Sequence, residues 1–217
     1  MDCLLSFDDM NKLGIKRRSV PYTEYFEPMD LTDEQKEERE SFSEDTEDKL
    51  LFALILLALL DEYGVSEPER IQQVTETLTM EFTGVIERYT TIDDHLRSYA
   101  EDFSATFVET TIENISEAWF MSEDRVMFDS ENEANTVLNY KDYIRAIASG
   151  YTKKEWVTFK DNRVRKTHKV LDGKTIGITN LFEVGNTFMA YPKDLAHGAA
   201  NHPESYINCR CTVHFHK

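Results

Sequence analysis

Residues 43–64 read SEDTEDKLLFALILLALLDEYG and predict the helical architecture of this chain. Ser43 is a suitable N-cap, the acids that follow occupy the first turn, where the helix dipole favours negative charge, and Gly64 is a typical stop. The apolar run Leu50–Leu60 is uninterrupted, but it has only about half of the roughly 20 residues that span a bilayer. We therefore expect a helix that is buried on most sides against partner helices, and no contact with a membrane.

Two further segments show the periodicity of amphipathic helices. A cap and a first-turn proline, Ser66 and Pro68, open the first of them. Its apolar residues are Ile71, Val74, Leu78, Phe82, Val85, Ile86 and Tyr89. The next stripe comprises Ile92, Leu96, Tyr99, Phe103 and Phe107 and continues with Ile112, Ile115 and Trp119. A shorter helix is expected over about 131–149, before Gly150. Because each segment alone would expose its apolar face, a helical hairpin or bundle is expected.

The pattern changes after Gly150 to short alternating segments separated by turns. The expected strands are Lys154–Phe159, Thr175–Ile178, Thr187–Tyr191 and Cys211–Phe215. Turns are predicted at 171–174 (LDGK) and at Gly185-Asn186. The expected fold class is therefore α+β, with an extended acidic arm over 1–43, a helical region over 44–150 and a small strand-rich domain over 151–217.

Charge is distributed unevenly along the chain. The 217 residues carry a formal net charge of −17 at pH 7, with a pI of about 4.7, which argues against DNA wrapping over the whole surface. Residues 1–150 hold 13 Lys and Arg against 35 Asp and Glu, and residues 151–217 hold 11 against 6, so the two parts carry −22 and +5. We interpret the acidic helix faces as solvated surface, with mimicry of DNA as the alternative. A local basic patch is expected in the C-terminal part.

Cysteine usage and the N-terminus bear on the compartment. The chain has three cysteines, two of them separated by one residue, which is not the even framework of a secreted disulfide domain. A disulfide between Cys209 and Cys211 would be strained at this spacing. The first residues, MDCLLSFDDM, are acidic and lack a basic region before a long apolar core. We therefore expect a reducing compartment and no signal peptide.

Several short motifs in the C-terminal part resemble one known family. They are Trp156–Lys174 (WVTFKDNRVRKTHKVLDGK), Phe182, Tyr191-Pro192 and Ile207–Thr212 (INCRCT). This ordered set, within about residues 130–217, is similar to the phage Mu F-like minor head proteins, also called head morphogenesis proteins. The resemblance implies a structural component of a tailed-phage head that acts in head morphogenesis, DNA packaging or DNA ejection. It also implies that the protein is not an enzyme.

The resemblance further implies a location and a set of partners. The protein is expected in the virion, in the head interior or at the portal vertex, and in the host cytoplasm during assembly. The implied partners are the portal protein, the major capsid or scaffolding protein, and packaged DNA. We assign protein contacts to the N-terminal arm and the Leu50–Leu60 helix. The residues expected to contact the DNA backbone without reading sequence are Lys160, Arg163, Arg165, Lys166 and Lys169.

Most other motif residues are expected to be structural. Asp161 can cap the turn after the Trp156 strand, with Arg163 or Arg165 in reach of its carboxylate. Asp172-Gly173 is a tight-turn pair. Phe182 and Tyr191, like Trp156, are expected in the core. The full set of expected structural motif residues is Trp156, Asp161, His168, Asp172, Gly173, Asn208, Cys209, Arg210 and Cys211.

The same motifs raise the question of zinc. Many relatives carry Cys-x-x-Cys, where this chain has Arg165 and His168 at the two cysteine positions, and they also end in Cys-x-Cys. The candidate ligands that remain are His168, Cys209 and Cys211, with His202 or His214 as a fourth. A closed structural site needs four ligands, and arginine is not normally one. We therefore expect no cofactor, and hydrogen bonds from Arg165 and His168 that tie their turn to the C-terminal strand.

A phosphodiester-cleaving domain similar to toxin-like ribonucleases is the alternative function. In such a domain His168 would act as the general acid or base, and the neighbouring cations would stabilise the charge of the transition state. No carboxylate stands at a motif-like spacing from His168, and the sequence has no P-loop, dinucleotide-binding glycine pattern, zinc-protease motif or nucleophile elbow. We therefore expect no catalytic residues. An internal scaffold without nucleic-acid contact is the third alternative.

Overall fold

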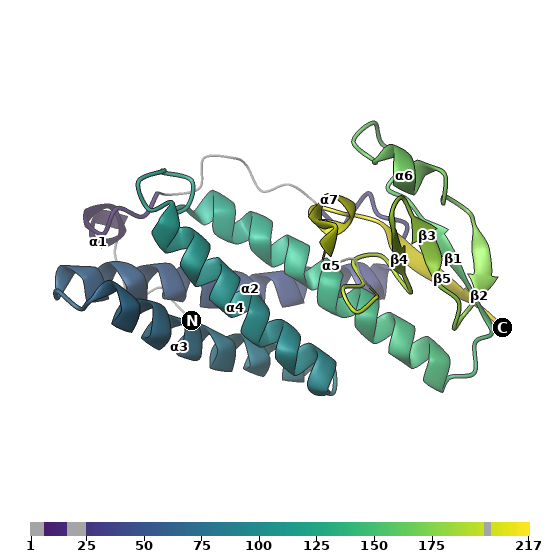
Figure 1. Cartoon of the computed structure of the whole chain (residues 1–217), viewed down its shortest axis with the longest axis horizontal. Helices are drawn as coiled ribbons and strands as arrows, with labels where there is room; N and C mark the ends of the chain where they lie inside the picture. The colour runs from purple at the N-terminus through teal and green to yellow at the C-terminus, as the bar shows by residue number, and fades with distance from the viewer. Residues whose placement is uncertain (1–6, 17–24, 198–200) are drawn as a thin grey trace. The chain divides into compact units, whose positions relative to one another are not determined.

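A computed structural model describes residues 7–16, 25–197 and 201–217 of the chain (Figure 1). The helices are α1 (Phe7–Lys12), α2 (Asp33–Glu62), α3 (Glu67–Tyr89), α4 (Asp94–Glu113), α5 (Glu123–Ala148), α6 (Lys166–Lys169) and α7 (Pro203–Tyr206). The strands are β1 (Lys153–Val157), β2 (Thr175–Gly177), β3 (Phe182–Val184), β4 (Thr187–Met189) and β5 (Thr212–His216). Long helices come first and short antiparallel strands follow, so the predicted α+β class is confirmed.

Helix α2 begins at Asp33, so the expectation that residues 33–43 belong to an extended arm is wrong. The helix starts with a capping box. Gln35 N donates to Thr32 Oγ1 at 3.2 Å, and Thr32 N donates to Gln35 Oε1 at 3.1 Å. Another part of the expected arm forms the short helix α1, whereas residues 1–6 and 17–24 of the arm lie outside the described residues.

Two other helix boundaries also differ from the sequence prediction. Helix α4 ends at Glu113, so Ile115 and Trp119 do not continue its apolar stripe but lie in the connection to α5. Helix α5 begins at Glu123 rather than near residue 131. The hydroxyl oxygen of Ser122 accepts a hydrogen bond from Arg125 N at 3.2 Å, which is the geometry of an N-cap.

The chain forms two compact units. The first, which we call the helical unit, consists of Met1–Thr23 and Ser41–Ser130, and the second, the mixed unit, consists of Glu24–Glu40 and Glu131–Lys217. Helices α2 and α5 each contribute residues to both units. The units therefore do not coincide with the three segments expected from the sequence, because the first turns of α2 belong with the strands.

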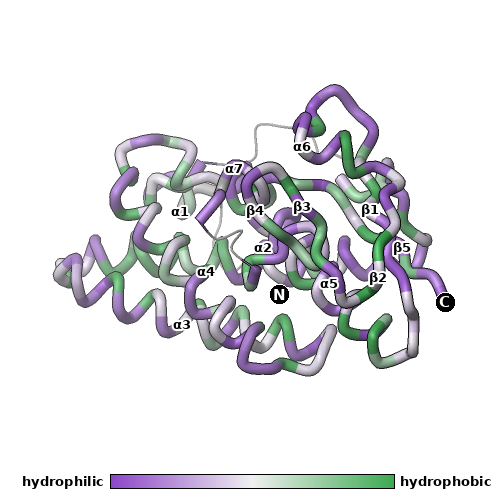
Figure 2. The backbone as a smooth tube through the Cα atoms, turned by 45° about the vertical axis from the view of Figure 1, so that its right-hand side comes forward, coloured by the Kyte–Doolittle hydropathy of each residue, from purple (hydrophilic) through white to green (hydrophobic). Residues whose placement is uncertain are grey.

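The core of the helical unit is built from the apolar faces of its helices, and Figure 2 shows hydrophobic and hydrophilic stretches alternating along them. Its buried residues are Met10, Ile15, Leu50, Ala53, Leu54, Leu57, Val74, Leu78, Phe107, Val108, Met121 and Val126. Within the run Leu50–Leu60 only Phe52 is exposed, so the expected burial of this helix on most sides is confirmed. In the part of the chain that the structure describes, no helix is long and apolar enough to cross a membrane.

The mixed unit contains an antiparallel sheet of order β2-β1-β5 and a separate hairpin of β3 and β4. In the sheet Trp156 lies opposite Val213. The core consists of Trp156, Leu171, Phe182, Val184, Met189, Cys209 and Cys211. Helix α5 is fastened to the segment before β5, because the Asn135 amide donates to the carbonyls of Cys209 and Cys211, at 3.0 and 3.3 Å.

Candidate functional site

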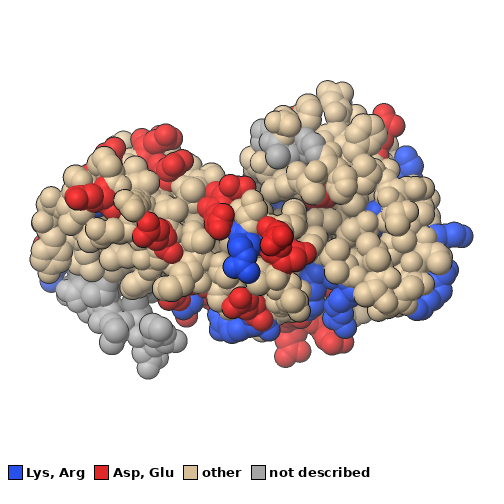
Figure 3. Space-filling view, turned by 60° about the horizontal axis from the view of Figure 1, so that its bottom comes forward, with Lys and Arg blue, Asp and Glu red and all other residues tan. Residues whose placement is uncertain are grey.

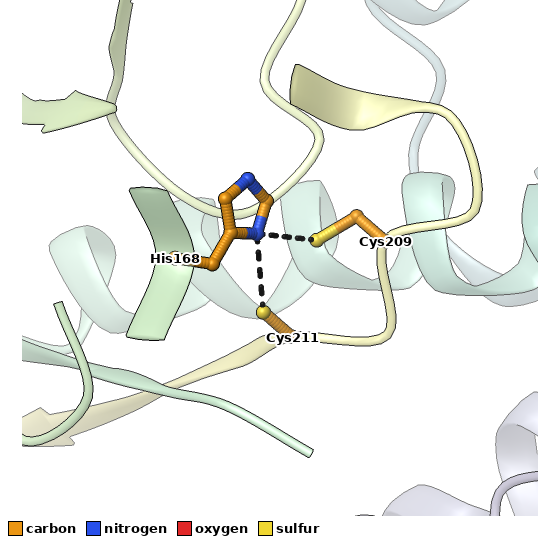
Figure 4. Close-up of side chains that lie close together, drawn as sticks. All are labelled: His168, Cys209 and Cys211. Atoms are coloured by element: carbon orange, nitrogen blue, oxygen red, sulfur yellow. Dashed lines mark hydrogen bonds between the residues drawn. The ribbon is translucent and has the colours of Figure 1, made fainter. Parts of the chain in front are cut away.

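His168, Cys209 and Cys211 form a buried cluster in the mixed unit (Figure 4). His168 lies on α6, and the two cysteines lie in the segment that leads into β5. The Nδ1 atom of His168 is 3.5 Å from each of the two Sγ atoms. All three residues are at most 2% exposed. In Figure 4 the imidazole turns its Nδ1 edge toward both sulfurs, so the motif residues of two distant segments meet at one point.

Local backbone geometry brings these side chains together. Asn208 has φ 56°, a left-handed conformation that asparagine tolerates better than most residues. The turn that it forms is closed by a hydrogen bond from Cys209 N to Tyr206 O at 3.1 Å. On the opposite side, the Arg165 guanidinium donates to the carbonyl of Ile207. Arg165 thereby ties the start of α6 to the segment before the cysteines.

The two thiols of the cluster have different acidities. A hydrogen bond from Cys211 lowers the pKa of Cys209, and the neighbouring His168 acts in the same direction, although burial opposes both. The reverse holds for Cys211, because its interaction with Cys209 and its burial raise its pKa. Cys209 is therefore the more acidic of the two thiols. Both cysteines are free rather than joined in a disulfide.

The cluster has nitrogen and sulfur donors, which zinc prefers, and its three ligand atoms lie within 4.8 Å of one another. The two histidines considered as a fourth ligand do not join it. His202 Nδ1 lies 3.0 Å from Glu204 Oε1, and His214 Nε2 lies 2.9 Å from the carbonyl oxygen of Asp30. Among the described residues the set therefore stays one donor short of a closed tetrahedral site.

We predict that this corner of the mixed unit folds without zinc. Protein purified without chelator should contain far less than one zinc per chain, and a chelator should leave the melting temperature unchanged, because Arg165 supplies a hydrogen bond in place of a ligand. The variant Arg165→Cys would complete a four-ligand set, so it should bind zinc and gain a chelator-sensitive melting temperature. About one zinc per wild-type chain, with a large loss of stability on chelation, would refute the prediction.

The five basic residues considered for DNA contact fall into two groups. Lys160, Lys166 and Lys169 are exposed, and within the described residues they have no ion pair or hydrogen bond through their amines. In contrast, Arg163 Nε lies 3.2 Å from Asp161 Oδ2, and Arg165 donates to a carbonyl. On the face drawn in Figure 3, basic side chains gather over the part that carries the strands, and acidic ones are numerous over the helices. The lysines are the cations most available to a phosphate.

Asp161 organises the loop that carries these cations. Its Oδ1 accepts hydrogen bonds from the backbone N–H groups of Arg163 and Val164, at 2.9 and 3.1 Å. Its Oδ2 accepts a hydrogen bond from Arg210, whose guanidinium lies 3.6 Å from the ring centroid of Phe159. Burial opposes ionisation of Asp161, but the hydrogen bonds from Arg210 and Arg163 lower its pKa. Arg210 is a partner that the sequence did not reveal.

Asp172 and Gly173 close the turn between α6 and β2. Asp172 Oδ1 accepts hydrogen bonds from the backbone N–H and the hydroxyl of Thr158, at 2.8 and 2.9 Å. Gly173 has φ 76°, a left-handed conformation that glycine adopts without strain, and its N–H donates to Trp156 O at 2.9 Å. The turn is therefore joined to the end of β1, directly beside the buried cluster.

One histidine–carboxylate pair was not found from the sequence. His197 Nδ1 lies 2.6 Å from Asp194 Oδ2, and Asp194 is fully buried. A carboxylate behind an imidazole can orient it as a general base, and the His197 ring is 44% exposed. The i,i+3 spacing of the two residues was the only signal in the sequence. His168 is instead 1% exposed and faces two sulfurs, which does not suit a residue that must reach a substrate.

About three fifths of the chain, in its C-terminal part, match a known family. Residues 87–214 match the family model described as "Phage Mu protein F like protein". The match begins in the last turn of α3, ends in β5 and includes the cluster and its surrounding loops, so it covers more than half of the chain. It also starts well upstream of residue 130, where the resemblance in the sequence began. No curated protein and no solved structure matched the chain significantly.

Proposed function

Because the chain belongs to the Phage Mu protein F-like family, whose members act in phage head morphogenesis, we propose that it is a minor head protein that contacts the portal protein and packaged DNA. The observation that carries this proposal is the family match over residues 87–214, which contains all the motif residues of the mixed unit. The buried His168–Cys209–Cys211 cluster then has a structural role. It holds α6 against the segment before β5, so that the basic loop keeps its shape.

The distribution of charge supports different binding partners for the two units. The helical unit carries 9 basic against 24 acidic side chains, and such a surface repels the phosphates of DNA, whereas the mixed unit carries 15 against 17. We assign protein contacts to the helical unit, with the portal protein as the main partner and the major capsid or scaffolding protein as further partners. The mixed unit presents Lys160, Lys166 and Lys169 on one loop and helix, and these cations contact the DNA backbone without reading sequence.

Purified phage particles provide the test of this function. Quantitative mass spectrometry of particles should find the protein at a constant, low ratio to the portal protein, and particles assembled without it should show defects in DNA content or delivery. The matched control is a particle from a host that supplies the protein in trans, which should restore both properties. Absence of the protein from mature particles and from assembly intermediates would overturn the proposal.

Removal of the three free lysines should weaken DNA binding by the full-length chain in a salt-dependent way. Each phosphate contact contributes about 0.9 to the slope of log K against log salt concentration, so Lys160→Gln, Lys166→Gln and Lys169→Gln together should reduce the slope by about 2 to 3. The measurement is fluorescence anisotropy with duplexes of unrelated sequence. A control with Lys12, Lys16 and Lys49 replaced by glutamine changes the net charge equally but should keep the slope. Equal slopes for both variants would favour a scaffold without DNA contact.

Phosphodiester cleavage is the second candidate function, and the His197–Asp194 pair is the observation that favours it. We nevertheless predict no nuclease activity, because the family is one of structural head proteins and His168 is buried against two sulfurs. RNA and DNA should remain intact on incubation with the protein, with and without divalent metal. Cleavage that is lost in His197→Ala or His168→Ala would replace the structural function by this one.

A further inference from the structure

Three large apolar side chains of the helical unit are exposed between the end of α4 and the second turn of α5. Ile115, Trp119 and Phe128 are 44%, 45% and 37% exposed. The rings of Trp119 and Phe128 contact each other edge to face, with their centroids 6.2 Å apart. We call these three residues the Trp119 patch. Scattered exposed apolar residues are ordinary on protein surfaces, but an exposed aromatic pair is typical of interaction sites.

The connection between α4 and α5, which carries Trp119, is fixed by side-chain hydrogen bonds to its backbone. Ser122 Oγ donates to the carbonyl of Trp119 at 2.6 Å, and Arg125 Nη1 donates to the carbonyl of Phe120 at 3.2 Å. Arg125 is itself buried, and its guanidinium lies between the rings of Phe107 and Phe120, 4.3 and 4.9 Å from their centroids. A side chain on such a support loses little conformational entropy when a partner binds.

The patch is flanked by carboxylates at the C-terminal end of α4, where the helix dipole disfavours negative charge. Glu109 and Glu113 are exposed at the C-terminal end of α4, and the exposed Glu117 follows in the connection. The last turn of α4 carries no basic residue. Carboxylates at this end of a helix are repelled by its dipole, and these three have no ion-pair partner within the described ranges. A cationic partner would relieve this repulsion.

We propose that the Trp119 patch is a docking site for a protein surface that is apolar at its centre and rich in Lys and Arg at its edge. Trp119 provides the buried aromatic anchor of such an interface, and the three glutamates provide charge complementarity. The same glutamates repel phosphate, so a nucleic acid or an anionic lipid surface does not suit the patch. The inference rests on the proposed function only in the choice of head proteins as binding probes.

The experiment measures the affinity of the full-length chain for the portal, major capsid and scaffolding proteins of the same phage, each purified. One of them should bind the wild-type chain, and Trp119→Ala should raise the Kd at least tenfold. The double variant Glu113→Gln/Glu117→Gln should raise it severalfold and weaken its salt dependence, without altering any buried group. Tyr63→Ala, which removes an 81% exposed aromatic elsewhere in the helical unit, should leave the Kd unchanged.

The outcomes separate this inference from the proposed function. Equal affinity of Trp119→Ala and wild type, or no binding of the wild type to any of the three proteins, overturns the docking site, even when the protein is found in particles. If the wild-type chain forms a dimer that Trp119→Ala abolishes, the patch binds a second copy of this chain. That result also overturns the proposed docking site. Binding that the variants weaken, together with absence of this protein from mature particles and from assembly intermediates, keeps the docking site and removes the proposed function. Far-UV circular dichroism of each variant confirms that it is folded.

Discussion

Replacement of Trp156 by alanine should lower the free energy of unfolding by about 3–5 kcal/mol, the usual cost of removing a large aromatic side chain from a core. Trp156 is fully buried on β1. Its ring centroid lies 5.2 Å from that of Phe182 and 5.4 Å from that of His168, both edge to face. Truncation would leave a cavity that joins the sheet, the hairpin and the His168–Cys209–Cys211 cluster. Urea unfolding followed by far-UV circular dichroism measures the loss.

The second tryptophan of the chain is a matched control for this measurement. Trp119 is 45% exposed, so Trp119→Ala should cost less than about 1 kcal/mol. Trp156→Phe keeps an aromatic ring in the core, so it should cost clearly less than Trp156→Ala. Equal destabilisation by alanine at the two positions would contradict the burial of Trp156.

Periodicity identified most of the helices and strands, but side-chain caps mark where α2 and α5 begin. The prediction of an extended acidic arm missed Thr32 and Gln35, which form a capping box. The start of α5 was also predicted too late, because Ser122 follows an aromatic segment that was assigned to the preceding stripe. In both places the helix begins at a local capping hydrogen bond, and not at the boundary that composition over a longer stretch predicts.

Lys154 shows why alternation alone does not assign the faces of a strand. Lys154 and Trp156 lie on the same face of β1, and both are fully buried. The amine of Lys154 lies 4.6 Å from the ring centroid of Tyr143 on α5, and its burial lowers its pKa to about 8, although Asp194 acts in the opposite direction. A rule that places lysines in solvent misses this position, because the aromatic neighbours come from distant segments.

The motif residues were found from the resemblance, and Arg163 was predicted as a partner of Asp161, but the contacts with distant segments were not found. The contact between Asp161 and Arg210 joins two loops, and nothing local in either loop indicates the other. The hydrogen bond from Arg165 to Ile207 likewise connects segments that only the folded chain brings together. Sequence reasoning could propose that Arg165 forms a hydrogen bond in place of binding a metal. The acceptor of this hydrogen bond, the carbonyl of Ile207, is positioned by the turn at Asn208, which a single sequence does not specify.

Replacement of Arg39 by methionine should also lower the free energy of unfolding by about 3–5 kcal/mol, although the sequence analysis predicted that this residue lies in an extended acidic arm. Its side chain is fully buried. The guanidinium donates to Asp142 Oδ2 at 3.1 Å, to Asn139 Oδ1 at 3.2 Å and to the carbonyl of Gln35 at 3.3 Å. Methionine fills most of the space but leaves the largely buried Asp142 carboxylate without its cation, so the desolvation of that charge is no longer compensated.

An exposed ion pair serves as the control for the Arg39 measurement. The Arg88 side chain is 51% exposed and lies 3.1 Å from Asp45 Oδ2. Its replacement by methionine should cost less than about 1 kcal/mol, because water and salt screen an exposed pair. Amide hydrogen exchange provides a second readout, since loss of the Arg39 contacts should speed exchange in residues 33–40 more than in the rest of α2. Equal costs at the two arginines, with unchanged exchange in 33–40, would mean that the first turns of α2 contribute no stability to the mixed unit.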